Sequence, residues 1–326
     1  MIEHVRPHEM IALSLMSQGK VRDIFFLESA PDRLLVVTSD RISAYDWVMP
    51  DGIPGKGVIL NRMSAFWFGM MSDIIANHMI SIDPREYPKE CEPYLQYLAG
   101  RTMLVQKAMP LPVECIMRGN ITGSFWSDFK KADVLKNGKS SSLHDARKII
   151  HGLALPADMQ ESEEFLRPLF TPSTKASVGA HDENVSFDQM IEIMREWLPH
   201  NGFIIDPAVL CMNVRRASED IYIRARKYAK KRRIIIADTK FEFGLLPSGK
   251  LIFIDEALTP DSSRFWPADQ IVLGKTPPSF DKQFLRDWLV AQGWDKKSPP
   301  PHLSQEVIEM TSQKYQEAYN RLVLQG

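Results

Sequence analysis

The charged run in an otherwise apolar segment is the strongest chemical signal in the sequence. Asp238, Lys240 and Glu242 occupy alternate positions, separated by Thr239 and Phe241. Alternate side chains of a strand share one face, and three charges on one face are costly to bury unless partners neutralise them. The segment therefore predicts a charged surface that binds a ligand or an ion. A solvated hairpin with exposed charges is the alternative.

The hairpin that follows could bring a second carboxylate beside Glu242. A turn centred between Ser248 and Gly249 would place Glu242 opposite Asp255, with Cβ atoms ~5 Å apart. Like charges repel at that distance, so a cation is needed between them. Lys240 is one candidate and Mg²⁺, which binds one or two protein carboxylates, is the other. A register shifted by one residue would turn Asp255 to the other face, so both interpretations stay open.

Two glycine-containing segments could bind anions. Lys20 and Arg22 follow Gly19, and two cations at alternate positions beside a glycine can reach one phosphate chain. The segment from Arg118 to Ser124 lies between an expected strand and a short helix, where backbone amides favour anions. Neither segment has the spacing of a P-loop, and ordinary turns are the alternative for both.

Polar side chains also gather in three loops: residues 256–264, 171–175 and 179–184. Loops that follow strands are well placed to bind ligands, although in the first of them Asp261 could simply cap a surface turn. A metal site at His181 is not expected, because adjacent loop residues rarely all face one ion.

Hydrophobic periodicity and capping signals place these segments on a framework of strands and helices. The expected strands are 21–27, 34–38, 102–107, 113–117, 233–244 and 251–256, and the expected helices are 63–75, 186–197, 207–230, 282–292 and 304–324. This order indicates an α+β protein with two lobes, residues 1–108 and 109–326. We expect the Met and aromatic stripe of residues 63–75 to be core, and residues 136–160 to be a surface excursion.

Composition excludes several classes of protein. Lys and Arg number 40 against 41 Asp and Glu in 326 residues, which disfavours a protein that grips long nucleic acid. The three cysteines, Cys91, Cys115 and Cys211, are too few and too scattered for a disulfide framework. Neither a secretory signal nor an apolar run of membrane-spanning length is present. We therefore expect a cytoplasmic protein without a membrane partner.

Several long blocks closely resemble the succinocarboxamide synthase (SAICAR synthetase) family, in its longer form. They run from about residue 15 to 290 in the family's order, and the principal ones are GKVRDIF at 19–25, TSDRISAYDWVMPDGIPGKGVILN at 38–61, VECIMRGNITGSFW at 113–126, FTPSTKASVGAHDENVSF at 170–187, IADTKFEFG at 236–244 and DEALTPDSSRFWP at 255–267. The resemblance implies a small antiparallel β lobe similar to a kinase N-lobe, a larger α+β lobe and ATP between them. It implies that ATP drives the joining of L-aspartate to carboxyaminoimidazole ribonucleotide, with ADP and phosphate as the other products.

The resemblance also implies roles for individual residues. The implied ATP-binding residues are Gly19, Lys20, Arg22, Lys107, Met109, Lys240 and Glu242. Glu242 and Asp255 would hold Mg²⁺. The implied ribonucleotide-binding residues are Arg118, Ser124, Asp238 and Arg264. The residues implied to lie near aspartate or the transferred phosphate are Lys175, Asp182 and Asn184. Lys240, Asp238 and Lys175 are the catalytic candidates, with Asp238 a candidate proton acceptor.

Two positions depart from the family pattern: Asn120 stands where an aromatic residue is common, and Ala180 where Glu is common. A small-molecule kinase on the same scaffold is the alternative enzyme, although the His-Arg-Asp and Asp-Phe-Gly motifs of protein kinases are missing. A nucleotide-binding relative without catalysis is the non-enzyme alternative. The sequence leaves open whether the protein is a monomer or a homo-oligomer.

Overall fold

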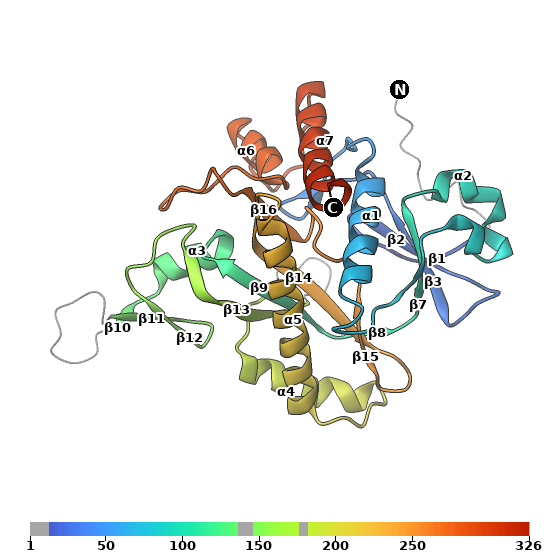
Figure 1. The fold of residues 1–326 in the computed structure, drawn as a ribbon, viewed down its shortest axis with the longest axis horizontal. Helices are drawn as coiled ribbons and strands as arrows, with labels where there is room; N and C mark the ends of the chain where they lie inside the picture. Colours follow the sequence, from blue (N-terminus) through green and yellow to red (C-terminus); the bar gives the residue numbers. More distant parts are fainter. Residues whose placement is uncertain (1–12, 136–145, 176–181, 326) are drawn as a thin grey trace. The chain divides into compact units, whose positions relative to one another are not determined.

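The computed structural model describes residues 13–135, 146–175 and 182–325 (Figure 1). These residues form two compact units. Unit 1 comprises the described parts of 1–109, 252–262 and 279–326, and unit 2 those of 110–251 and 263–278. Both units contain helices and strands, which confirms the α+β class. The expected contiguous second lobe, 109–326, differs from this division. The chain returns to unit 1 because Phe253 forms a backbone bridge with Asn77.

Unit 1 is built on a five-stranded antiparallel sheet of order β1-β2-β3-β7-β6. Its strands are β1 Ser14–Gln18, β2 Arg22–Phe26, β3 Arg33–Thr38, β6 Met79–Ser81 and β7 Thr102–Gln106. Three of the expected strands are thereby confirmed. Phe25, Leu35 and Leu104 from this sheet are almost fully buried and form a core with Leu98 and Cys91.

The helices of unit 1 include α1, which is buried on most of its surface. Met63, Trp67 and Met71 are almost inaccessible to solvent, so this part of the predicted Met and aromatic stripe is core, whereas its other four residues are only partly buried. The helix ends at Met70, before the end of the stripe. The helical elements are α1 Lys56–Met70, η2 Pro84–Glu86, η3 Lys89–Tyr94, α2 Leu95–Leu98, α6 Gln283–Ala291, α7 Gln305–Tyr319 and the π-helix η5 Asn320–Leu324. Unit 1 also contains a small hairpin of β4 Ser43–Ala44 and β5 Trp47–Val48.

Unit 2 contains the antiparallel strands on which most of the candidate site residues lie. In this sheet β9 lies between β13 and β14, and β16 pairs with β14. The strands are β9 Val113–Asn120, β13 Glu164–Thr174, β14 Ile234–Leu245 and β16 Ser263–Pro267. Helix α5, Pro207–Lys230, runs across one face (Figure 1). Its buried Tyr222 donates a hydrogen bond to the Ile236 carbonyl at 2.5 Å. Helix α5 therefore covers one face of this sheet.

Capping signals in unit 2 are confirmed. Ser186 and Gln189 form a capping box at the start of α4, Phe187–His200. The Asp206 side chain accepts from two backbone amides at the start of α5. The described helices include none that is long and apolar enough to cross a membrane.

The expected surface excursion at 136–160 is partly wrong. Residues 136–145 lie outside the described residues, but the segment after them contributes two strands to a three-stranded antiparallel sheet. Its strands are β10 Val134–Leu135, β11 Arg147–Ile150 and β12 Leu153–Pro156. The neighbouring helix is α3 Gly123–Lys131. Ile150, Leu155 and Met159 pack with Phe125 and Phe129 of α3. This small second core was missed because the apolar residues are few and widely spaced. The remaining short strands are β8 Met109–Pro110 and β15 Leu251–Ile254.

Candidate active site

Strand β14 carries the predicted charged face. Thr239, Phe241 and Phe243 are buried, whereas Lys240 and Glu242 are half-buried, so the predicted alternation is confirmed from residue 239 to 243; Asp238, the third charged residue, is buried. Asp238 lies opposite Arg118 of β9 in the strand register.

A lysine–glutamate cluster occupies one part of this face. The Lys240 ammonium lies 2.5 Å from a Glu114 carboxylate oxygen and 3.0 Å from one of Glu242. Lys175, which follows β13, donates to the other Glu242 oxygen at 2.5 Å. Burial acts to raise the pKa of Glu242, but the charges of Lys240 and Lys175 outweigh it and lower that pKa to about 2. Glu242 is therefore ionised at neutral pH.

An arginine–aspartate cluster occupies the next part of the face. The buried Arg118 donates to Asp238 at 3.1 Å and to the Thr171 hydroxyl at 2.9 Å. Arg264, from β16, donates to the same Asp238 oxygen. Gly123 has φ of +60°, and a Cβ there would lie 2.5 Å from the Arg264 guanidinium. Two guanidinium groups around one carboxylate leave an excess positive charge, which suits a phosphate.

The other predicted residues of unit 2 lie at the borders of these clusters. Ser124 is exposed in the first turn of α3. Asn184 forms a backbone bridge with Ser173 of β13, which holds the segment of Asp182 and Asn184 against that strand. Burial raises the pKa of Glu114, and the Asp182 charge adds to that rise. His181 and Ala180 lie outside the described residues.

In unit 1, one of the predicted phosphate-binding residues, Arg22, belongs to a third charged cluster. Arg22 donates to Glu256 at 2.5 Å and lies 3.7 Å from Asp255. The Gly19 amide donates to the Arg22 carbonyl at 2.7 Å in a tight turn, and Lys20 pairs with Asp46. Arg22 therefore lies between two carboxylates, and Lys20 forms a separate ion pair.

Lys107 and Met109, the predicted neighbours of the adenine, lie at the end of the unit 1 sheet. The Lys107 ammonium lies over the Phe26 ring, 5.0 Å from its centroid. Met109 is 44% exposed. Nothing in these contacts opposes a nucleotide-binding role, and that role stays a prediction.

Asp261 is the centre of a buried network that sequence reasoning missed. Its carboxylate accepts from Lys56 at 2.8 Å and from the Tyr315 hydroxyl at 2.6 Å, and it lies 3.3 Å from Lys282. The Asp261 side chain is 3% exposed, so the alternative of a surface turn is wrong. The partners lie on α1, on α7 and at the start of α6, up to 205 residues from Asp261 in the sequence. Local sequence patterns therefore could not reveal these contacts.

Lys56 gives a pH dependence that can be tested. Burial lowers the pKa of Lys56 to about 8; the Lys282 charge acts in the same direction and Asp261 opposes it. The unfolded chain then binds more protons between pH 8 and the ordinary lysine pKa of about 10.4, so stability should rise with pH in that window. Urea unfolding at pH 7 to 10 should show this rise relative to Lys56→Met. Parallel curves for the two proteins would contradict it.

The predicted hairpin register differs from the structure. The Leu246 amide donates to the Lys250 carbonyl, so the turn is centred on Ser248, half a residue before the expected centre, and the strand pairing shifts by one residue. Strand β15 ends at Ile254 and Asp255 has a left-handed φ of 64°. Strand alternation therefore does not determine where the Asp255 side chain points, and the Glu242–Asp255 metal pair rests on the resemblance.

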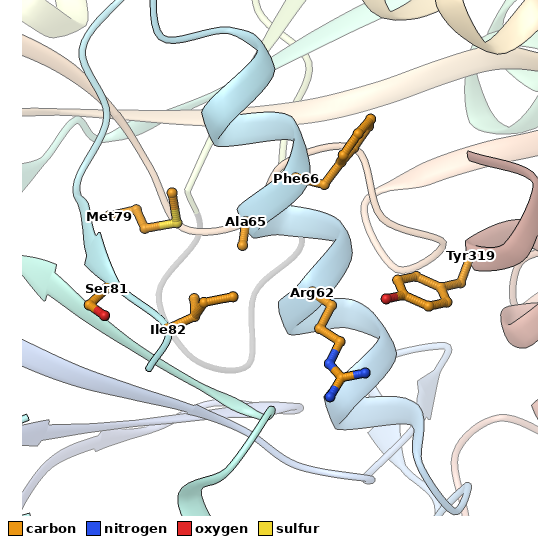
Figure 2. Close-up of a pocket in the computed structure, with 7 residues that line it drawn as sticks. All are labelled: Arg62, Ala65, Phe66, Met79, Ser81, Ile82 and Tyr319. Atoms are coloured by element: carbon orange, nitrogen blue, oxygen red, sulfur yellow. The ribbon is translucent and has the colours of Figure 1, made fainter. Parts of the chain in front are cut away.

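A shallow hollow of about 560 Å³ lies elsewhere in unit 1. Figure 2 shows Arg62, Ala65 and Phe66 of α1 among its lining residues, with Met79, Ser81 and Ile82 on one side of the helix and Tyr319 on the other. The lining includes no residue of the charged clusters, so we do not assign the reaction to it.

Comparison with known proteins identifies the family. The SAICAR synthetase family model matches residues 15–301. The chain belongs to the SAICAR synthetase family. It is 48% identical to a phosphoribosylaminoimidazole-succinocarboxamide synthase of Geobacter sulfurreducens over the full length of both chains, and 49% identical to one of Geobacter metallireducens over 96% of each. A solved Saccharomyces cerevisiae SAICAR synthase, complexed with SAICAR, is 38% identical over 95% of each chain with a TM-score of 0.78. Membership of the SAICAR synthetase family makes this chain an enzyme, a ligase of purine biosynthesis.

Proposed function

We propose that this enzyme condenses L-aspartate with 5-amino-1-(5-phospho-D-ribosyl)imidazole-4-carboxylate, at the expense of ATP, to give the succinocarboxamide, ADP and phosphate. The charged face of β14 is the observation that carries the proposal. It joins an arginine–aspartate cluster, suited to a ribonucleotide phosphate, to a lysine–glutamate cluster, suited to a transferred phosphoryl group. The kinase-like N-terminal lobe and the ATP cleft between lobes, which the resemblance implies, belong to this proposal.

The reaction needs an activated carboxylate, because a carboxylate does not accept an amine at neutral pH. An oxygen of the imidazole carboxylate attacks the γ-phosphorus of ATP, which releases ADP and leaves an acyl phosphate. The aspartate amine then attacks the acyl carbon, phosphate departs with that oxygen, and the amine loses a proton. Lys240 and Lys175 would stabilise charge on the phosphoryl group, and Arg118 and Arg264 would fix the ribonucleotide. Asp182 and Asn184 would border the aspartate.

Mg²⁺ fits the chemistry of the proposed donors. Glu242 is ionised, with its pKa near 2, and the Asp255 side chain is 30% exposed beside Arg22. Carboxylate oxygens are the protein ligands that Mg²⁺ prefers. Bound there, the ion would neutralise charge on the ATP phosphates. Lys20 and Arg22 would add further positive charge for the phosphates.

The proposal is tested by leaving out one component at a time. Purified protein is incubated with ATP, Mg²⁺, the ribonucleotide and L-aspartate, and ADP and the succinocarboxamide are measured by chromatography. Equal amounts of both products, formed only when every component is present, are expected. ADP release without aspartate, with a stable phosphorylated product, would instead indicate a kinase.

Arg264→Gln should weaken ribonucleotide binding selectively. Loss of one charge-assisted hydrogen bond to a phosphate corresponds to roughly a 10- to 100-fold higher KM for the ribonucleotide. The KM values for ATP and aspartate should stay within about threefold of those of the unmodified enzyme. Arg233→Gln is the matched control, because Arg233 pairs with Asp269 at an exposed position of the same unit. Equal effects on all three substrates would contradict the assignment.

A further inference from the structure

Ser173 of β13 carries a buried hydroxyl without a hydrogen-bond partner in the described part of the chain. The residue is 2% exposed, and its Oγ makes no hydrogen bond with any residue that the structure describes. The great majority of buried polar side-chain atoms in folded proteins are paired, because an unpaired one has given up its hydrogen bonds to water. This hydroxyl therefore requires an explanation, and a ligand that accepts from it would be one.

The strand geometry places the Ser173 side chain on the charged face of the sheet. Ser173 lies directly opposite Glu114 of β9 in the strand register, and directly opposed side chains share one face. Glu114 pairs with Lys240 of the charged face at 2.5 Å. Phe170, at an odd spacing from Ser173, belongs to the other face, where its ring meets that of Phe187 of α4 edge-on.

The alternate neighbours of Ser173 along the chain belong to the two charged clusters of unit 2. Thr171, two residues before it, accepts from Arg118 at 2.9 Å in the arginine–aspartate cluster. Lys175, two residues after it, donates to Glu242 at 2.5 Å in the lysine–glutamate cluster. Ser173 therefore lies between the cluster suited to the ribonucleotide phosphate and the cluster suited to the transferred phosphoryl group.

We propose that the Ser173 hydroxyl donates a hydrogen bond to the imidazole carboxylate of the ribonucleotide. The inference rests on the proposed function, in which this carboxylate links the nucleotide held by the arginines to the phosphoryl group held by the lysines. The reacting carboxylate must then lie between the two clusters, which is where Ser173 stands. The hydrogen bond orients the carboxylate for attack on the γ-phosphorus, and Ser173 forms no covalent bond. The incoming carboxylate competes with Glu114 and Glu242 for the two lysines, which opens this part of the face to the substrate.

The carboxylate itself provides the test. Calorimetry measures the binding of the ribonucleotide, and of the same aminoimidazole ribonucleotide without its carboxylate, to the unmodified protein and to Ser173→Ala. The affinity of Ser173→Ala for the carboxylated ribonucleotide should fall about 10- to 100-fold, because a hydrogen bond to a charged group is lost. Its affinity for the ribonucleotide without the carboxylate should stay within about threefold of the unmodified value, because that ligand offers no acceptor there.

Further measurements separate this role from a structural one. Removal of a hydroxyl that has no partner in the protein should leave the Tm of Ser173→Ala equal to or above the unmodified value. Ser173→Cys keeps the bulk but donates only weakly, so its affinity for the carboxylated ribonucleotide should fall almost as far. Ser218→Ala is the matched control, because the buried Ser218 hydroxyl donates to the Val214 carbonyl at 2.8 Å within α5. It should leave both affinities unchanged.

Three results would overturn the inference. The first is a set of Ser173→Ala affinities that are unchanged, or equally reduced, for both ribonucleotides. The second is full affinity of Ser173→Cys, which would show that bulk and not the donor matters. The third is a Tm of Ser173→Ala lower by more than about 3 °C, which would show that the hydroxyl has a partner in the protein. Failure of the unmodified protein to bind either ribonucleotide would overturn the proposed function as well, which distinguishes the two failures.

Discussion

Glu242→Gln should lower kcat by about 100-fold or more without unfolding the protein. Glu242 accepts from Lys175 and Lys240 through its two oxygens, and glutamine preserves the shape while removing the charge. Loss of one preorganised electrostatic group at a phosphoryl or acyl transfer site costs roughly 10²–10³ in kcat. Steady-state kinetics with each substrate varied, together with circular dichroism, checks this result.

The matched control for this substitution is Glu164→Gln. Glu164 lies on β13 of the same sheet, its side chain is 58% exposed, and its partner is Arg226 at 3.2 Å. Its kcat should remain within about twofold of that of the unmodified enzyme, because an ion pair of an exposed carboxylate has little effect. Near-normal activity of Glu242→Gln at saturating Mg²⁺ would remove Glu242 from the proposed chemistry.

Asp261→Asn should destabilise the protein by about 3–5 kcal/mol, the usual cost of breaking a buried ion pair. Its carboxylate is held between Lys56, which is fully buried, and Lys282. Burial acts to raise the pKa of Asp261, but these two ammonium groups outweigh it and hold the pKa well below its usual range. The substitution leaves both cations without their counter-ion. Urea unfolding at pH 7 measures the effect.

Two further proteins test the origin of that loss. Asp269→Asn removes an exposed partner of Arg233 and should cost less than about 1 kcal/mol. Adding Lys56→Met to Asp261→Asn should recover part of the lost stability, because one uncompensated buried charge is removed. A free energy of unfolding for Asp261→Asn within about 1 kcal/mol of the unmodified value would contradict the ion-pair account. The contribution of the Asp261 carboxylate to the free energy of unfolding should also be lost as the pH falls below the ordinary Asp pKa, because Asp261 then becomes protonated.

Local patterns in the sequence were sufficient for much of the framework. The alternation of Asp238, Lys240 and Glu242 predicted which face of β14 is charged, because strand geometry has a period of two. The capping carboxylate of Asp206 and the capping box at Ser186 predicted two helix starts. Each of these signals acts within a few residues, so no knowledge of the tertiary fold was needed.

Contacts between distant segments could not be derived in that way. The pairing of Arg264 with Asp238 depends on β16 lying beside β14, and that of Lys56 with Asp261 spans 205 residues. The conformation of Asp255 depends on where the Ser248 turn ends and on the backbone bridge at Phe253. Glu114 had a usable signal: it lies four residues before Arg118 on one strand, so the two side chains share a face.

The fate of the carboxylate oxygens tests the central claim most directly. The ribonucleotide is prepared with ¹⁸O in both carboxylate oxygens, and the phosphate released during turnover with ATP and L-aspartate is examined by mass spectrometry. Activation of the carboxylate as an acyl phosphate transfers one labelled oxygen to each phosphate, and the other should remain in the amide. Unlabelled phosphate, formed together with the succinocarboxamide, would contradict this account and show that ATP is cleaved without phosphorylation of the substrate.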